Sequence, residues 1–463
     1  MISRLKASST IDPLRLDYIL GKSTLLAIFL FFNFMVTFRV LLVSVVPEVE
    51  LVAEALYEAI ILLYLVYRLS LRVVSGNLRL NSLELYLVLM FFLPVIAANG
   101  ARAEFGQPMI YGILTFRDFY LIYGGLIVYN MLRTNTVTIQ LVEKMLVLTA
   151  WINVLMFYFM SLFVDPRQFI ETGLAGANDA KGGDVYFRFN MAYIFFGSIY
   201  YFVKAFYRKN FKYLILGAVF LFYVTFFRFD RTSMASVFGA LAMFFVTALT
   251  PRRQLMWILI GFIPILFLVT SVYFVSPELF EQYYLMFADA FATLLGTANA
   301  EGEESVRLNE LRIALEHIEK NPLIGNGKVS NQWVEGGYSH FLGFFYASDV
   351  GIFGQIFMYG FIGAFLLYFQ FLLSLNYALK IRHIKRNVFL VSLKFMMFAI
   401  MLDSITNGYL TIYAAQSVTA LILIYYFYQK DFIIGAELRE KKLEQSKILI
   451  SRQKHLDENH EAK

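Results

Sequence analysis

The 463-residue sequence contains no cysteine and few charged residues. The absence of cysteine excludes disulfide bonds, thiolate metal ligands and a cysteine nucleophile. Charged residues make up only 16% of the chain, against about 25% in a typical soluble domain, whereas 59% are hydrophobic, against roughly 45–50%. This balance excludes an ordinary soluble protein. The net charge of +6 is concentrated in particular loops, and we expect no nucleic-acid partner.

The hydrophobic residues come in runs of about 18–25, each long enough to cross a hydrocarbon core of roughly 30 Å as a helix. The sequence therefore predicts an all-α polytopic membrane protein with about twelve transmembrane helices. These are expected near 24–46, 50–67, 82–99, 111–132, 140–164, 186–206, 211–227, 232–249, 255–275, 350–375, 388–405 and 408–428. The first run is too long for the core of a signal peptide and has no cleavage site before Pro47, so we interpret it as an uncleaved span.

Lysine and arginine are distributed unequally between alternate loops. The cation-rich set of loops includes both ends of the chain, whereas the alternate loops at 47–50, 99–108, 165–185, 276–349 and near Asn407 contain little lysine. Cytoplasmic loops carry the excess of lysine and arginine, so both termini are predicted to be cytoplasmic. The expected organisation is a cytoplasmic N-terminus (1–23), spans one to nine (24–275), a large outer loop (276–349), spans ten to twelve (350–428) and a charged cytoplasmic tail (429–463).

Arginine recurs at one depth, near the outer ends of the expected spans. The residues are Arg39, Arg117 beside Asp118, Arg188, and Arg228 and Arg231 around Asp230, with Asp403 at the same depth. An arginine within a span normally faces protein or a water-filled cavity, and guanidinium binds phosphate oxygens through two parallel hydrogen bonds. The group therefore predicts an anion-binding site. Snorkelling to lipid phosphates, or pairing with the neighbouring aspartates, remains an alternative for each residue.

The large outer loop is expected to contain two helices. Residues 276–295 show the pattern of an amphipathic helix on the membrane surface. A second helix begins near residue 305 and stops before Pro322, with an apolar stripe of Leu308, Leu311, Leu315 and Ile318. Arg307 and Arg312 flank this stripe, and the spacing of Arg312 and Glu316 also fits an ordinary surface pair.

A glycine-rich stretch follows, in which Gly325, Gly327, Gly336 and Gly337 mark turns. We expect His340 to lie where the chain re-enters the membrane, facing the anion-lined region, where a base that titrates near neutral pH is useful. A purely structural role for His340 remains open. His317, between Glu316 and Ile318 on a charged helix, is expected to be solvated.

Several motifs between residues 305 and 363 occur in a characteristic order. They are Arg307 at a helix start, NPLIGNG at 321–327, His340, and a Gly-x-x-Gly formed by Gly351 and Gly354; Arg231 in FDRTS begins an earlier span. In this respect the chain resembles the O-antigen polymerase and O-antigen ligase superfamily of bacterial surface-polysaccharide assembly. It departs from the pattern where Phe341 replaces a polar residue and Asp230 replaces a serine, and it lacks the Arg-x10-Gly motif of some polymerases.

The resemblance implies glycosyl transfer at the periplasmic face of the bacterial inner membrane, from a glycan linked by diphosphate to a polyprenyl lipid such as undecaprenol. The expected catalytic residues are His340, which takes a proton from or orients the acceptor hydroxyl, and Arg231 and Arg307, which stabilise the departing diphosphate. Further diphosphate-binding candidates are Arg228, Arg188, Arg117 and Arg312, and possible supporting residues are Asp349, Asp230, Gly325 and Gly327. No metal or cofactor is expected, because guanidinium groups can stabilise that charge.

Three functions remain in competition. A polymerase adds the chain to another lipid-linked repeat unit, and we favour it because Leu311 and Phe341 depart from ligase features. An O-antigen ligase passes the chain to lipid A-core. A flippase or transporter of lipid-linked oligosaccharides also has about twelve spans, but the sequence shows no repeated halves. Expected partners are the lipid-linked oligosaccharide, membrane lipids and, for the enzymes, a chain-length regulator and a flippase.

Overall fold

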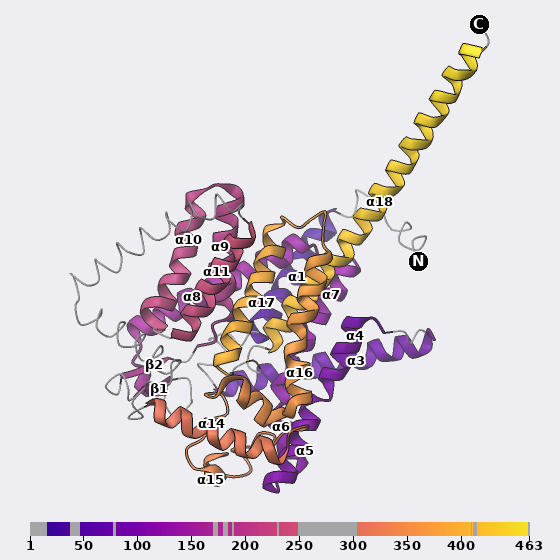
Figure 1. The fold of residues 1–463 in the computed structure, drawn as a ribbon. Coiled ribbons are helices and arrows are strands. Elements are labelled where there is room, and N and C mark those ends of the chain that lie inside the picture. Colours follow the sequence, from indigo (N-terminus) through magenta and orange to yellow (C-terminus); the bar gives the residue numbers. More distant parts are fainter. Residues whose placement is uncertain are drawn as a thin grey trace.

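The computed structural model describes residues 16–37, 47–76, 80–169, 175–178, 184–187, 189–228, 231–248, 303–408, 410 and 414–461 (Figure 1). Within these residues the chain is almost entirely helical. Figure 1 shows a helical body, with α14 and α15 at one end and a long C-terminal helix, α18, leaving the opposite end. The expected span at 255–275 and the expected amphipathic helix at 276–295 lie outside the described residues.

The elements follow one another with short connections. The first half consists of α1 (Leu16–Thr37), α3 (Pro47–Val74), α4 (Ser82–Phe91), α5 (Leu93–Phe105), α6 (Met109–Thr115), the 3-10 helix η4 (Arg117–Tyr123), α7 (Gly124–Arg133), α8 (Ile139–Phe163) and the 3-10 turn η5 (Pro166–Phe169). The second half consists of β1 (Ala175–Asn178), β2 (Asp184–Phe187), α9 (Ala192–Arg208), α10 (Phe211–Phe222), the π-helical turn η7 (Tyr223–Arg228), α11 (Arg231–Ala248), α14 (Glu303–Lys320), α15 (Ser339–Leu342), α16 (Gly351–Lys380), α17 (Val388–Thr406) and α18 (Ala414–Glu461).

Hydropathy marks this chain as a multi-pass membrane protein. In the described part, four helices are long and apolar enough to cross a membrane: Ser82–Phe105, Ile139–Phe163, Gly351–Lys380 and Val388–Ile405. Three shorter apolar helices accompany them, at Thr24–Thr37, Phe211–Phe227 and Thr232–Ala248. The helical character expected from the apolar runs is therefore confirmed in the described ranges. The number of twelve spans and the orientation of the termini stay predictions.

Several helix starts follow from side-chain caps in the sequence. Asn81 accepts a hydrogen bond from the backbone N–H of Glu84, and the Glu84 carboxylate accepts one from the N–H of Asn81, which forms a capping box at α4. Asn387 caps α17 by accepting from the N–H of Leu390 at 3.0 Å. These caps satisfy backbone donors that have no partner within the helix.

Three expected spans are broken helices. The expected helix at 82–99 divides at Phe92, just before Pro94, into α4 and α5. The expected helix at 111–132 divides into α6, η4 and α7, with Arg117 at the start of the 3-10 segment. Helix α16 contains Gly360 with φ 64° and ψ −178°, a non-helical conformation that glycine adopts without a steric penalty. The three breaks thus lie next to Pro94, at the charged segment that begins with Arg117, and at Gly360.

Two further expectations need correction. The glycine-rich stretch at 165–185, expected as a loop, forms most of the antiparallel pair β1–β2, which continues into the start of the expected span at 186–206, where Phe187 pairs with Ala175. Helix α14 confirms the expected second helix of the outer loop, but it buries only part of the expected stripe: Ile318 is buried and Leu311 is half-buried. Leu308 and Leu315 are 53% and 41% exposed, whereas Glu310 and Ala314 are buried. The Glu310 carboxylate accepts a hydrogen bond from the N–H of Tyr346 at 2.9 Å, so a polar contact helps to set which face turns inward.

Candidate anion-binding site

Two cationic side chains line one small polar pocket. Its volume is about 260 Å³, and it is lined by Glu54, Leu114, Thr115, Arg117, Lys328, Val329, Ser330, Asn331 and Gln332. Arg117 comes from the break between α6 and η4, and Lys328 follows directly after the NPLIGNG motif. The Lys328 ammonium lies 6.0 Å from the centre of the Phe116 ring, next to Arg117 in the chain. With one carboxylate, from the buried Glu54, the lining carries a net positive charge.

A buried glutamine fixes the segment that carries Lys328. Gln107 is fully buried; its amide donates to the carbonyl of Lys328 at 3.1 Å and accepts from the N–H of Ser330 at 2.7 Å. The hydroxyl of Tyr338 donates to the carbonyl of Gly327. Burial raises the pKa of Tyr338 well above its usual value, so this hydroxyl remains a donor at physiological pH. The backbone is thereby held at Gly327, at Lys328 itself and at Ser330.

The NPLIGNG motif docks into the break of α16. The N–H groups of Asn326 and Gly327 donate to the carbonyls of Phe357 and Met358 at 2.7 and 2.9 Å. In return, the N–H groups after Gly360 donate to the loop: Phe361 to Pro322 at 2.8 Å and Ile362 to Leu323 at 3.3 Å. The loop therefore pairs backbone groups that the break releases, as a membrane helix requires.

Gly325 and Gly327 are required by this docking. Both have positive φ, at 71° and 69°. A Cβ atom at Gly325 would collide with the backbone N of Gly360, and one at Gly327 would collide with the carbonyl of Ala97 in α5. Their contribution to the site is therefore close backbone packing.

A polar network beneath the loop includes a histidine that we expected to be solvated, and that expectation was wrong. The side chain of His317 is 13% exposed, and its Nδ1 lies 2.9 Å from the Glu104 carboxylate. The second oxygen of Glu104 accepts from the Asn321 amide at 2.9 Å. Asn321 also donates to the Oδ1 atom of Asn326 at 2.8 Å, and the amide of Asn326 donates to the carbonyl of His317 at 3.2 Å. Asn321 thus bonds the motif to α5, and Asn326 bonds it to α14.

His340 lies on the surface of the same loop. It belongs to the short helix α15 and is exposed, and α16 begins only at Gly351, so His340 does not itself open a span. Its neighbour Phe341 packs against Trp333 with ring centres 5.8 Å apart and against Phe105 at 5.2 Å. This packing gives an aromatic residue a structural role at the position where Phe341 departs from the ligase pattern.

The remaining described candidates lie on α14 and near α16. Arg312 is exposed; it donates to Asn309 at 2.9 Å and pairs with Glu316 at 3.9 Å, as the alternative from its spacing predicted. Asp349 is half-buried just before α16 and accepts from the Ser348 hydroxyl at 3.0 Å. Of the predicted diphosphate-binding arginines whose side chains are described, Arg117 alone lines the pocket.

The side chains of the other five predicted residues are not among those that the structure describes. Three of them have described backbones: Arg228 in η7, Arg231 at the first position of α11 and Arg307 in the second turn of α14. Arg188 and Asp230 lie outside the described residues. The roles of these five residues stay proposals.

Sequence reasoning missed Lys328, Glu54, Gln107 and Glu104. Lys328 carried a detectable signal, since it extends NPLIGNG by one residue on a side that is otherwise poor in lysine. The other three gave none, because each contacts a loop that is more than two hundred positions away in the sequence. Only the folded chain brings them to it.

Comparison with known proteins adds a family. Residues 216–368 match the family model described as O-antigen ligase. This segment, about a third of the chain, contains α14, α15, NPLIGNG, His340 and the break of α16. The resemblance to the O-antigen ligase and polymerase superfamily is thereby confirmed. No curated protein matches the chain in sequence. The match supports a glycosyl-transferring role in surface-polysaccharide assembly, of either the ligase or the polymerase type.

Proposed function

We propose that the protein transfers a glycan from a polyprenyl diphosphate at the outer face of the inner membrane, and that it acts as a polymerase of lipid-linked repeat units. The observation that carries this proposal is the pocket that joins Arg117 to Lys328 beside the family's NPLIGNG loop. Its volume of about 260 Å³ lies below the roughly 300–1,000 Å³ that is usual for small-molecule sites, which suits a diphosphate better than a glycan chain.

The proposed reaction depends more on stabilising the negative charge of the leaving diphosphate than on a covalent bond between substrate and protein. The bond between the anomeric carbon and the diphosphate oxygen breaks, and the electron pair leaves with the lipid diphosphate. A hydroxyl of the acceptor sugar forms the new bond to that carbon and loses its proton to His340. Arg117 and Lys328 hold the diphosphate oxygens as negative charge grows there, and Arg231 and Arg307 are proposed to assist them.

The polymerase is distinguished from the ligase by its acceptor. Phe341, packed between Trp333 and Phe105, favours the polymerase because it replaces the polar residue of ligase-type signatures. The description of the matched family favours the ligase as the second candidate. The third candidate, a flippase, would need a passage for the glycan, whereas the break in α16 is filled by the NPLIGNG loop.

Complementation of a gene deletion tests these alternatives through the pattern of surface polysaccharide on a gel. A polymerase deletion leaves single repeat units on lipid A-core, whereas a ligase deletion and a flippase deletion both leave bare core. Extraction of the lipid carrier separates the last two, because full-length chains accumulate on it without a ligase and single repeat units accumulate on it without a flippase. We expect Arg117→Ala and Lys328→Ala each to lose about 10²–10³-fold in transfer rate, with partial rescue by Lys328→Arg. The matched control is Lys320→Ala, an exposed cation of α14 outside the pocket. Full-length polysaccharide from both pocket variants, expressed at the level of the control, would reject the pocket.

A further inference from the structure

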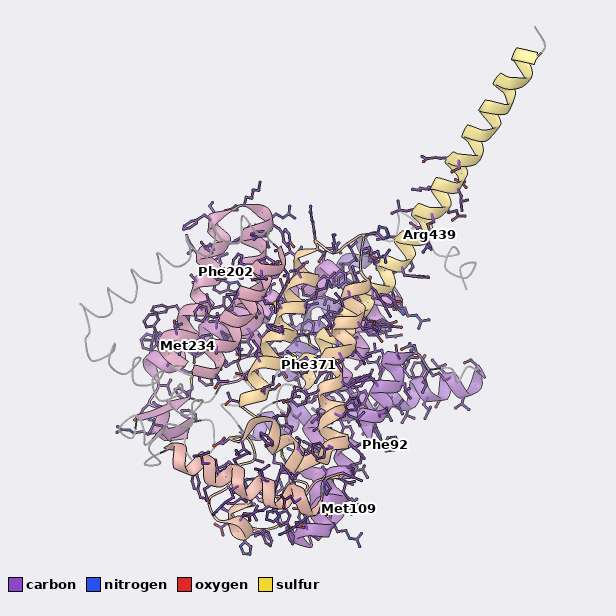
Figure 2. All side chains as sticks on the ribbon, in the orientation of Figure 1. Phe92, Met109, Phe202, Met234, Phe371 and Arg439 are labelled. Carbon is purple, nitrogen blue, oxygen red and sulfur yellow. The ribbon has the colours of Figure 1, made fainter. Side chains whose placement is uncertain are left out.

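A second, much larger cavity lies between two groups of helices. It has a volume of about 1490 Å³ and lies between α9, α10 and α11 on one side and α16 on the other, with α17, which packs against α9 and α11, as its floor. Its walls are predominantly apolar, and Figure 2 labels Phe202 on one side and Phe371 on the other. The volume exceeds the range of roughly 300–1,000 Å³ that is usual for small-molecule sites.

One end of this cavity, which we call the groove, is cationic. Lys209 and Asn210 line it at the end of α9, Lys385 and Arg386 line it between α16 and α17, and Lys394 lines it within α17. Among the described lining residues there is no carboxylate. The nearby Asp431 already accepts hydrogen bonds from the backbone N–H groups of residues 382–384. The cations therefore form a net positive rim.

This end is opposite the candidate anion-binding site. Helix α16 begins at Gly351, after the loop that carries Lys328, and its last residue, Lys380, precedes Lys385 and Arg386. Figure 1 likewise shows the α9–α10 turn and α14 at opposite ends of the body. The two anion-attracting regions are thus separate.

The depth of the apolar wall corresponds to one leaflet of a membrane. On α16 the lining runs from Phe371 to Leu379, a rise of about 12 Å at 1.5 Å per residue, and on α17 the apolar lining beyond Lys394 runs from Phe395 to Met401, a rise of about 9 Å. The hydrocarbon core is about 30 Å thick, so the wall lies within one leaflet. A cationic rim above such a wall matches a phosphate headgroup with acyl chains below it.

We propose that this groove binds an anionic phospholipid, with its phosphate at Lys385, Arg386 and Lys209 and its acyl chains over α17, between α9–α11 and α16. A transmembrane helix of another protein would continue through both leaflets, which the one-leaflet wall does not favour. The site is independent of the proposed transferase function, because it uses none of the residues that line the candidate anion-binding site.

Lipid binding by the purified full-length chain tests the proposal. Native mass spectrometry is carried out with phosphatidylglycerol and with phosphatidylcholine of identical acyl chains, and a photoactivatable phosphatidylglycerol locates the contact in vesicles. The rim variant is K385A/R386A. The matched control is K380A/R382A, which removes the same charge from the same connection without touching the groove. A third variant, Ala205→Trp, fills the apolar wall. Thermal melting in detergent establishes that each variant is folded.

We expect phosphatidylglycerol to bind more tightly than phosphatidylcholine, and the rim variant to weaken that binding about 30-fold, at about 1 kcal/mol per cation. The control should bind as the wild type does, and Ala205→Trp should abolish cross-linking to α9 and α17. Equal weakening in both charge variants would mean attraction to the surface alone and would overturn the proposal. So would equal affinity for the two lipids, or cross-links showing that residues 249–302 or a partner protein fill the groove.

Discussion

The docked NPLIGNG loop depends on one buried amide, and replacing Asn326 by aspartate tests that dependence. Asn326 is fully buried, and its Nδ2 atom donates to the carbonyls of His317 at 3.2 Å and Phe357 at 3.3 Å. Its Oδ1 atom accepts from Asn321 at 2.8 Å. The N326D variant keeps the shape and the accepting oxygen, but it turns two donor contacts into contacts between acceptors.

The expected loss of folding stability in N326D follows from these contacts. Two lost hydrogen bonds cost about 1 kcal/mol each, because each carbonyl keeps one backbone N–H donor, from Asn326 or Asn321. Burying an unpaired carboxylate raises the total to about 4 kcal/mol near neutral pH. Burial among carbonyls raises the pKa of the introduced carboxyl above its value in the unfolded chain. Protonation therefore favours the folded variant. The lost stability is partly recovered below the unfolded pKa, about 3.9 for aspartate, and is lost again as pH rises through the folded pKa.

Thermal unfolding in detergent, measured across a range of pH, provides the readout. N326D should melt well below the wild type at neutral pH, and the difference should shrink under acid conditions. N309D is the matched control, because Asn309 lies on the exposed face of α14; it should melt like the wild type at every pH. If N326D and N309D melt together at neutral pH, the loop does not depend on this amide and our account of the docking is wrong.

Other predictions concern the same loop and the opposite end of the molecule. Gly327→Ala should cost about 1–2 kcal/mol from its positive φ alone, and more from the collision with Ala97, seen as a lower melting temperature and reduced polysaccharide transfer. Asp431 is buried, which disfavours its charge, but the backbone N–H groups of Arg382, Ile384 and His383 outweigh this and lower its pKa. Its stabilisation is therefore present above the unfolded pKa and is lost as pH falls through the folded pKa. D431N should cost about 1–2 kcal/mol at neutral pH and flatten the acid limb of the stability profile.

The helices were predictable because each depends on a local apolar run. The expected span at 140–164 differs from α8 by one residue at each end, and the expected span at 388–405 begins where α17 begins and ends one residue before it. The broken helices were not predicted, since a run of apolar residues has the same hydropathy whether or not it contains a break. Gly360 shows why: its conformation is set by the loop that packs on it from outside the helix.

The site was only partly predictable for the same reason. Arg117 could be named from its charge within an apolar run, but nothing local pairs it with Lys328 or Glu54, which come from other parts of the chain. His317 was misjudged because the sequence shows its charged neighbours and not Glu104, which lies on α5 and pairs with it across the fold. Long-range polar contacts therefore account for most of what sequence reasoning missed.

The breaks in the helices and the candidate site have a common physical basis. An unbroken helix satisfies its own backbone and offers only side chains, whereas a break exposes N–H and C=O groups that must be paired inside protein. At Gly360 those groups are paired by NPLIGNG, and this pairing holds the backbone that Lys328 continues. The break before η4 sets Arg117 at the same pocket. Two irregular backbone segments, each of which would be unfavourable in lipid, thus line one polar pocket. The hydrogen bonds lost at the break of α16 are replaced by hydrogen bonds to the NPLIGNG loop, the same loop that leads to Lys328.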